Sequence, residues 1–282
     1  MTSERSVQSL IAETVSQLDQ VGVTDPNRDA RLLVALSLGI DVGRLTLHLH
    51  DPVEEGAVER AQALVERRKT REPMSHILGY REFYGRRFDV GPDVLDPRPE
   101  TETLIEAALS YPFQRVLDLG TGSGCILLTL LAENGGTSGV GVDLSDAALK
   151  VAHRNAEALG VTDRATFAQS DWYQGVVGQF DLIVSNPPYI SLKEMASLAP
   201  EVQKHEPRMA LTDEVDGLTF YRQIVSECMD QLEPNGRLLV EIGPTQAAAV
   251  SGMMDKAGLI DVTVLRDLDG RDRVVSGRRG AQ

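Results

Sequence analysis

A short apolar run leads into a glycine-rich turn at Arg115-Val116-Leu117-Asp118-Leu119-Gly120-Thr121-Gly122-Ser123-Gly124-Cys125-Ile126-Leu127-Leu128. Its first part predicts a buried strand, and its apolar end predicts the start of a helix. Glycines at a strand-to-helix turn let the backbone approach a ligand closely and present its N–H groups. A tight turn without a ligand has the same composition, so this interpretation needs support from the rest of the chain.

The residues around this stretch alternate between candidate strands and candidate helices. Besides residues 115–119, strands are predicted at 137–143, 165–168, 181–184 and 236–242, with an antiparallel closing pair at 262–265 and 273–276. Such alternation is typical of a mostly parallel sheet with helices on both faces. The sequence therefore predicts an α/β domain with a Rossmann-like, seven-stranded sheet.

The chain before this domain has a different pattern. Residues from about 4 to 78 keep a helical spacing of apolar residues, with Asp-Pro helix starts at Asp25 and Asp51. Residues 79–90 are aromatic-rich and alternate around Gly85, as in a β-hairpin. We therefore predict a helical bundle at 1–78, a hairpin connector at 79–97 and the α/β domain at 98–282.

The composition is that of an ordinary globular protein with an acidic surplus. Of 282 residues, 42% are hydrophobic and 25% are charged, and the formal net charge is −14. Nucleic-acid binders usually carry a basic footprint, so this charge argues against a free duplex as the main partner, although it allows a local basic groove. Cys125 and Cys228 have neither disulfide nor metal-ligand spacing, and no metal site is predicted.

The sequence also bears on cellular location. Met1-Thr2-Ser3-Glu4-Arg5 lacks the basic-then-apolar order of a signal peptide. No run approaches the roughly 20 apolar residues that a membrane-spanning helix needs. A cytoplasmic protein without a membrane partner is expected.

Acidic residues accompany three successive candidate strands. Asp118 precedes the glycine turn, Asp143 closes the second strand, and Asp171-Trp172 follows the third. An acid at such a strand end can bind ribose hydroxyls, and Asp171 with the Trp172 indole can hold a purine. Each acid alone could be a solvated strand end, but the set describes a nucleoside site. A dinucleotide fingerprint needs glycine where Cys125 stands, which disfavours a nicotinamide-dependent dehydrogenase. The predicted cofactor-binding residues are Asp118, Gly120, Thr121, Gly122, Ser123, Gly124, Asp143, Asp171, Trp172 and Asn186.

A second motif follows the strand at 181–184. Ser185-Asn186-Pro187-Pro188-Tyr189-Ile190 must end that strand, because consecutive prolines can neither continue a ladder nor enter a helix interior. The Asn186 side-chain oxygen and the Pro187 carbonyl are two acceptors, and Tyr189 supplies a flat aromatic face. These groups suit a planar ligand that carries an NH2 group. For an Asn-Pro pair alone, a polar loop that caps a core strand is the simpler interpretation.

Together with Asp143 and Trp172, the two motifs resemble class I S-adenosylmethionine-dependent methyltransferases that act on amino groups. The Asn186–Tyr189 element is shared by enzymes that methylate adenine and glutamine, so it does not choose the substrate. Further stretches resemble the release factor glutamine methyltransferase family (PrmC/HemK), namely residues 73–79, 82–85, 97–102, 205–211, 216–218 and 269–273. The likeness covers nearly the whole chain, but the first 70 residues match only in helical character. Asp96 departs from the family pattern, in which an aliphatic residue precedes Pro-Arg-Pro.

The resemblance implies methyl transfer from S-adenosyl-L-methionine to the side-chain amide nitrogen (N5) of the glutamine in the Gly-Gly-Gln loop of class I peptide chain release factors. It implies that Asn186, Pro187 and Tyr189 are catalytic, and that these residues and Pro188 bind the substrate. The two acceptors would hold the amide nitrogen in line with the methyl group and bind the positive charge that grows on it. Tyr189 would pack against the amide or its aliphatic stem.

Several alternatives stay open at this stage. An adenine-amino methyltransferase acting on DNA or RNA could use the same residues on a flipped base, although it would be expected to carry a basic face. A cofactor-binding protein without catalysis would conflict with the intact Asn186–Tyr189 element. Residues 194–216 form either a lid or docking loop or a surface loop without contact. The N-terminal bundle either docks the partner or steadies the main domain, and a monomer is expected.

Overall fold

The computed structural model describes residues 5–281, which divide into two compact units. One unit contains the chain up to Gly79 together with residues 199–205. The other contains residues 80–198 and the chain from Glu206 onward. Residues 1–4, where the signal-peptide pattern was sought, and residue 282 lie outside the described residues. Within residues 5–281, no helix is both long enough and apolar enough to cross a membrane.

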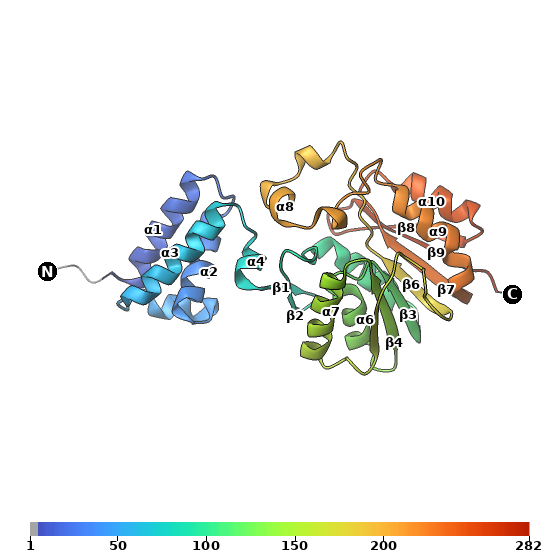
Figure 1. Ribbon diagram of the computed structural model, residues 1–282, viewed down its shortest axis with the longest axis horizontal. Helices are drawn as coiled ribbons and strands as arrows, with labels where there is room; N and C mark the ends of the chain where they lie inside the picture. The colour runs from blue at the N-terminus through green and yellow to red at the C-terminus, as the bar shows by residue number, and fades with distance from the viewer. Residues whose placement is uncertain (1–4, 282) are drawn as a thin grey trace. The chain divides into compact units, whose positions relative to one another are not determined.

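The first unit is built from helices (Figure 1). They are α1 (Val7–Gln20), α2 (Pro26–Leu38), the 3-10 helix η1 (Val42–His48), α3 (Glu55–Lys69), α4 (Met74–Leu78) and α8 (Pro200–His205). Side chains cap the first two: Ser6 accepts from the Ser9 N–H, and Asp25 accepts from the Arg28 N–H. The apolar faces of α1, α2 and α3 pack against one another. The helical character predicted for this part of the chain is confirmed.

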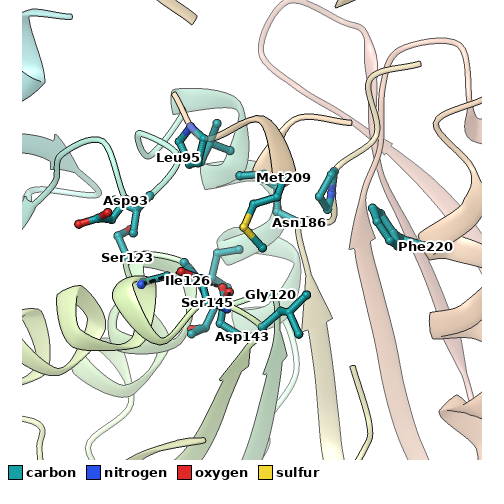
Figure 2. Close-up of a pocket in the computed structure, with 18 of the residues that line it drawn as sticks. Asp93, Leu95, Gly120, Ser123, Ile126, Asp143, Ser145, Asn186, Met209 and Phe220 are labelled. Carbon is teal, nitrogen blue, oxygen red and sulfur yellow. Dashed lines mark hydrogen bonds between the residues drawn. The ribbon is translucent and has the colours of Figure 1, made fainter. Parts of the chain in front are cut away.

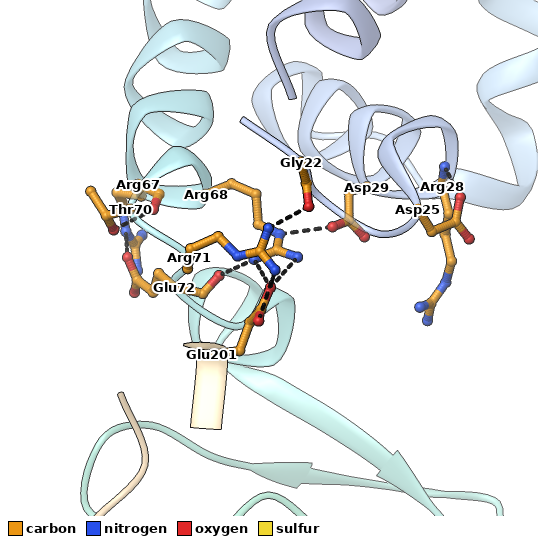
Figure 3. A network of polar contacts seen from close by, with 10 residues as sticks. All are labelled: Gly22, Asp25, Arg28, Asp29, Arg67, Arg68, Thr70, Arg71, Glu72 and Glu201. Carbon is orange, nitrogen blue, oxygen red and sulfur yellow. Dashed lines mark hydrogen bonds and ion pairs between the residues drawn. The ribbon is translucent and has the colours of Figure 1, made fainter. Parts of the chain in front are cut away.

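A polar network holds α8 in the first unit (Figure 3). The Arg68 guanidinium lies 2.7 Å from Asp29 on α2 and 3.2 Å from Glu201 on α8. Arg71 also reaches Glu201, at 2.9 Å, and donates to the Gly22 carbonyl. The Arg68 and Asp29 side chains are only 7% and 6% exposed, so this pair lies in the interior. No pattern in the sequence predicted it, because Arg68 and Glu201 are 133 positions apart.

The second unit contains a seven-stranded sheet of order β5-β4-β3-β6-β7-β9-β8 (Figure 1). Its strands are β3 (Arg115–Leu119), β4 (Ser138–Asp143), β5 (Ala165–Gln169), β6 (Phe180–Ser185), β7 (Leu232–Glu241), β8 (Ile260–Arg266) and β9 (Asp272–Arg278). The strands β3 to β7 pair in parallel, while β9 pairs antiparallel with both β7 and β8. The predicted fold class is therefore confirmed, including the antiparallel closing pair.

Helices cover both faces of this sheet because successive strand residues point to opposite sides. Val116 of β3 packs with α5 (Glu102–Leu109), α6 (Cys125–Glu133) and part of α7 (Asp146–Leu159). Its neighbour Leu117 packs in the other core, with α9 (Thr219–Gln231) and α10 (Ala247–Lys256). The strand β3 is thus buried on both sides. Its glycine turn and the ends of its neighbours are the parts left to bind a ligand.

The predicted hairpin consists of β1 (Tyr80–Phe83) and β2 (Arg86–Asp89), and it belongs to the second unit. Its two turn residues, Tyr84 and Gly85, have φ angles of 49° and 70°, as tight two-residue hairpin turns require. Asn155 on α7 fixes the hairpin to the domain, donating to the Asp89 carbonyl and accepting from the Asp89 N–H. Phe83 and Phe88 of the hairpin are buried in the core of this unit.

Candidate active site

A cavity of about 440 Å3 opens at the carboxyl ends of β3, β4 and β6, entirely within the second unit (Figure 2). This is the end of a parallel sheet where ligands bind, and the volume is typical of a small-molecule site. The predicted site residues that line the cavity are Gly120, Thr121, Gly122, Ser123, Asp143, Asp171, Trp172, Asn186 and Pro188. Asp118, Gly124, Pro187 and Tyr189 are not among the lining residues. The structure thus brings both sequence motifs to one cavity.

The glycine turn between β3 and α6 forms the floor of the cavity. Gly120 and Gly122 have φ angles of 71° and 55°, which favour glycine because a side chain is strained there. The N–H groups of Gly120 and Thr121 both donate to the Val142 carbonyl on β4, at 2.9 Å. Gly124 serves packing, since an added Cβ would lie 2.9 Å from a Leu128 methyl carbon. The turn is thereby held in one shape against the neighbouring strand.

Asp118 supports this turn from behind. Its carboxyl group is fully buried and accepts a 2.6 Å hydrogen bond from the Thr121 hydroxyl. Burial raises the Asp118 pKa to about 7, and the bond from Thr121 opposes that rise. The sequence placed Asp118 among the cofactor-binding residues, but in the structure it contacts the turn and does not line the cavity.

Asp143 both lines the cavity and braces the turn. One carboxylate oxygen accepts from the Gly122 N–H and the other from the Ser145 N–H, each at 2.9 Å. Burial raises the Asp143 pKa, while these backbone donors oppose the rise. An ionised carboxylate has about four acceptor positions, so two more bonds are available to a ligand. This is the chemistry expected of a partner for ribose hydroxyls.

An aromatic pair forms another part of the wall. Trp172 has a φ of 53°, an unusual conformation for a bulky residue, and its ring lies 5.1 Å from the Phe220 ring on α9. Both residues line the cavity, beside the carboxylate of Asp171. Such faces suit a planar aromatic ligand. The sequence analysis missed Phe220, because it lies 48 positions after Trp172 and belongs to none of the recognised motifs.

The Asn186–Tyr189 element begins where β6 ends, and its side chains point in different directions. Asn186 lines the cavity, and its amide nitrogen Nδ2 donates to the Thr101 hydroxyl at 3.4 Å. The Tyr189 hydroxyl lies 3.5 Å from the buried Glu241 carboxylate, and burial raises the Tyr189 pKa. A buried phenol needs a polar partner, and Glu241 provides it. The predicted packing of the Tyr189 ring on a substrate amide finds no support in the lining of the cavity.

Residues 93–98 line another side of the cavity, and residues 207–210 and 212–214 line a further side. Glu206 is almost fully buried and lies 2.6 Å from the guanidinium of Arg98. Arg98 belongs to the predicted Pro-Arg-Pro stretch, so this ion pair joins two motifs that are 108 positions apart. Met209 lines the cavity from this segment (Figure 2). Of the alternatives left open by the sequence, the second half of the 194–216 stretch is therefore a cavity wall.

Comparison with known proteins identifies the family of this chain. Residues 9–79 match the family described as "PrmC N-terminal domain", and residues 92–206 match "Methyltransferase small domain". A protein of Cereibacter sphaeroides named release factor glutamine methyltransferase is 54% identical over 264 residues, which are 94% of this chain and 95% of the relative. The chain belongs to the release factor glutamine methyltransferase family. The family predicted from the sequence is thus confirmed.

Another member of the release factor glutamine methyltransferase family, from Rhodospirillum rubrum, is 47% identical over 94% of this chain and 82% of its own. Among solved structures, a methyltransferase from Pyrococcus furiosus superposes with a TM-score of 0.54 at 17% identity, over 78% of this chain and 98% of that one. That likeness shows the fold alone. The protein is an enzyme of the methyltransferase class, and the adenine-amino alternative is not favoured, because these full-length relatives carry the glutamine name.

Proposed function

We propose that this protein transfers a methyl group from S-adenosyl-L-methionine to the N5 side-chain nitrogen of the glutamine in the Gly-Gly-Gln loop of class I peptide chain release factors. The observation that carries the proposal is that Asn186 and the glycine turn line one cavity. A methyl donor on the turn and an amide at Asn186 would therefore meet. The relatives named release factor glutamine methyltransferase, which match over nearly the whole chain, support glutamine as the target.

The residues of the cavity fit S-adenosylmethionine. The Gly120–Ser123 turn leaves room for close approach of a ligand to the backbone, and Asp143 has acceptor positions for ribose hydroxyls. The rings of Trp172 and Phe220 suit an adenine face. When bound, the cofactor supplies an electrophilic methyl group on a sulfonium. Asp118 and Gly124 are proposed to act on it indirectly, by holding the shape of the turn.

The chain's own residues would prepare the amide nitrogen for attack. That nitrogen is a weak nucleophile, because its lone pair is delocalised into the carbonyl. The Asn186 Oδ1 atom and the Pro187 carbonyl would accept its two N–H bonds, hold it in line and favour the form whose lone pair faces the methyl group. The same acceptors bind the nitrogen more tightly as positive charge grows on it, which lowers the barrier. Pro188 would form the adjoining wall.

The partner in this proposal is a protein loop. The net charge of −14 favours a protein substrate over free nucleic acid. The wall at residues 207–214, held at its start by the Glu206–Arg98 ion pair, is proposed to help admit that loop. The monomeric state and the cytoplasmic location stay predictions, as does docking of the release factor by the N-terminal bundle.

Methyl transfer from radiolabelled S-adenosylmethionine to a purified class I release factor tests the proposal. The factor is used with its loop glutamine intact and replaced by alanine, and an adenine-containing oligonucleotide is assayed in parallel. Label on the intact factor, absent from the glutamine variant and from the oligonucleotide, is the expected result. Label on the oligonucleotide alone would assign the protein to nucleic-acid methylation. Bound cofactor without transfer to either would leave a non-catalytic binding protein.

A further inference from the structure

The Asn186–Tyr189 element rests on a buried acid that the reaction described above does not use. Glu241 ends β7, and its side chain is fully buried. Its Oε2 atom has no hydrogen-bond partner among residues 5–281. Burial raises the Glu241 pKa to about 7, against hydrogen bonding from Thr101 and Tyr189 and the charge of Arg273. A buried carboxyl with an unpartnered oxygen is unfavourable for folding, so its presence here calls for an explanation.

Two contacts connect this acid with the cavity. Asn186 Nδ2 donates to Thr101 Oγ1 at 3.4 Å, and the Thr101 hydroxyl is near enough to the Glu241 carboxyl to lower the pKa of that group. The Tyr189 hydroxyl approaches Glu241 Oε1 at 3.5 Å. Both measured distances are at the long end of the hydrogen-bond range. Thr101 and Asn186 line the cavity, whereas Glu241 and Tyr189 lie behind it. The acid therefore acts on both polar side chains of the motif from the protein side.

The protonation of each group fixes the direction of this chain of contacts. An ionised carboxylate only accepts hydrogen bonds, so the single hydroxyl proton of Thr101 goes to Glu241. The Thr101 oxygen is then left as an acceptor, and the donor that meets it is the NH2 end of the Asn186 amide. The amide group is planar, so with Nδ2 directed at Thr101 its oxygen Oδ1 points the other way. That oxygen is the atom that a substrate NH2 group needs.

We propose that Glu241 and Thr101 are positioning residues that hold the Asn186 amide with its oxygen toward the substrate, and that Glu241 also places the end of the motif through Tyr189. This inference rests on the proposed function and deepens it. This orientation of the Asn186 amide would make the site specific for an NH2 group, because a flipped amide would place its own NH2 donor against the N–H donors of the substrate. Neither residue touches the reacting atoms, so both act through Asn186.

Replacement of Glu241 tests the direction of hydrogen bonding from Asn186 through Thr101 to Glu241. In Glu241→Gln, the new amide can donate to Thr101, whose proton can then turn to Asn186 Oδ1 and stabilise the flipped amide. We expect kcat for release factor methylation to fall at least 10-fold, with the dissociation constant of S-adenosylmethionine unchanged within 2-fold by calorimetry. Tyr221→Phe is the matched control, because its hydroxyl donates to the Glu241 main-chain carbonyl at 2.7 Å and not to the carboxyl. It should retain kcat within 2-fold.

Two substitutions of Thr101, one that keeps the hydroxyl and one that keeps the shape, distinguish a positioning role from a packing role. Thr101→Ser keeps the hydroxyl and should retain most of the wild-type kcat, whereas the isosteric Thr101→Val should lose as much as Glu241→Gln. If valine and serine lowered kcat equally, or if Glu241→Gln matched the wild type, the positioning role would be refuted. Loss of cofactor affinity in parallel with kcat would point to a structural role and would overturn the proposal as well. Absence of transfer by the wild-type enzyme would instead refute the proposed function.

The pH profile gives a readout that packing alone would not change. At saturating cofactor, protonation of Glu241 would allow it to donate, so wild-type kcat should fall as the pH drops through about 7. In Glu241→Gln this inflection should vanish. The titratable and charged groups around the carboxyl are Arg273, Glu100, Tyr189, Tyr221 and Cys125. An inflection of the same size in the Glu241→Gln enzyme would assign it to another group and count against the proposal.

Discussion

Asp143 offers the sharpest test of the cofactor site, because the structure gives it two functions. Its two oxygens each accept one backbone N–H at 2.9 Å, from Gly122 and Ser145, and the carboxylate also lines the cavity. Asp143→Asn is nearly isosteric but has a single acceptor atom. One backbone N–H must then face an NH2 group, and the negative charge available to ribose hydroxyls is lost.

The magnitude follows from these contacts. Hydrogen bonds to a charged group contribute about 1.5–3 kcal/mol each, and the variant loses one such bond as well as the charge. Part of this free energy is lost from the stability of the free protein, because Asp143 no longer braces the glycine turn fully. The other part is lost from cofactor binding. We expect the dissociation constant of S-adenosylmethionine to rise about 10- to 100-fold, which corresponds to about 1.4–2.7 kcal/mol. The free protein should lose about 1–2 kcal/mol of stability.

Isothermal titration calorimetry of cofactor binding, with urea unfolding of the free protein, separates the two effects. Asp146→Asn is the matched control: this acid lies three residues further on, pairs with Lys150 in an exposed i,i+4 contact and does not line the cavity. It should change neither quantity appreciably. A wild-type dissociation constant in Asp143→Asn would remove Asp143 from the ribose role. Equal weakening in Asp146→Asn would show a general charge effect.

Three further predictions concern turnover, folding and pH. Asn186→Ala should retain cofactor affinity and lose about 100- to 1,000-fold in kcat, measured by methyl transfer at saturating cofactor; affinity falling as steeply as kcat would refute this division of labour. Arg68→Met should lower the stability of the free protein by about 3–5 kcal/mol in urea unfolding, because it leaves Asp29 buried without its cation. Glu201→Gln, at the more exposed end of the network, should lower the stability less. Equal stability of the wild type and both variants would exclude a structural role for the network. Glu241→Gln should be more stable than the wild type above pH 7 while turning over more slowly. In the folded wild type Glu241 keeps its proton up to about pH 7, whereas in the unfolded chain it loses the proton at its ordinary pKa, so the stability of the wild type falls as the pH rises through that window. A difference in melting temperature between the two proteins that does not grow from pH 5 to pH 8 would contradict this reasoning.

Local sequence patterns were sufficient for the framework of the α/β unit. The glycine turn and the strands on either side could be predicted because hydrophobic periodicity and glycine conformation act over a few residues. Asp143 and Trp172, which line the cavity, could be placed near each other for the same reason, since acids and aromatics just after strands meet at one edge of a parallel sheet. Asn186 was found because its prolines end a strand at that edge.

Chemical type alone did not say which way a side chain would face. Tyr189 was predicted to support the substrate, yet its hydroxyl lies by Glu241, and Asp118 was predicted to bind the cofactor, yet it holds Thr121. A buried hydroxyl or carboxyl needs a partner, and the partner that it finds depends on which distant strand lies alongside. Glu241 itself reads as one acid at the end of an apolar strand, without any local signal of its place behind the motif.

The α/β architecture and the two motifs that meet at the cavity could thus be predicted from the sequence, because they depend on short-range periodicity and on residues adjacent to strand ends. The family was predicted from the resemblance of those motifs to the release factor glutamine methyltransferases. Only the tertiary structure decided that Arg98 pairs with Glu206, that Glu201 joins α8 to the N-terminal helices, and that Glu241 stands behind Asn186 and Tyr189. The reason is physical: these are pairings of single charged or polar groups across more than 50 positions, and a charge buried by folding takes whichever partner the packing brings within reach.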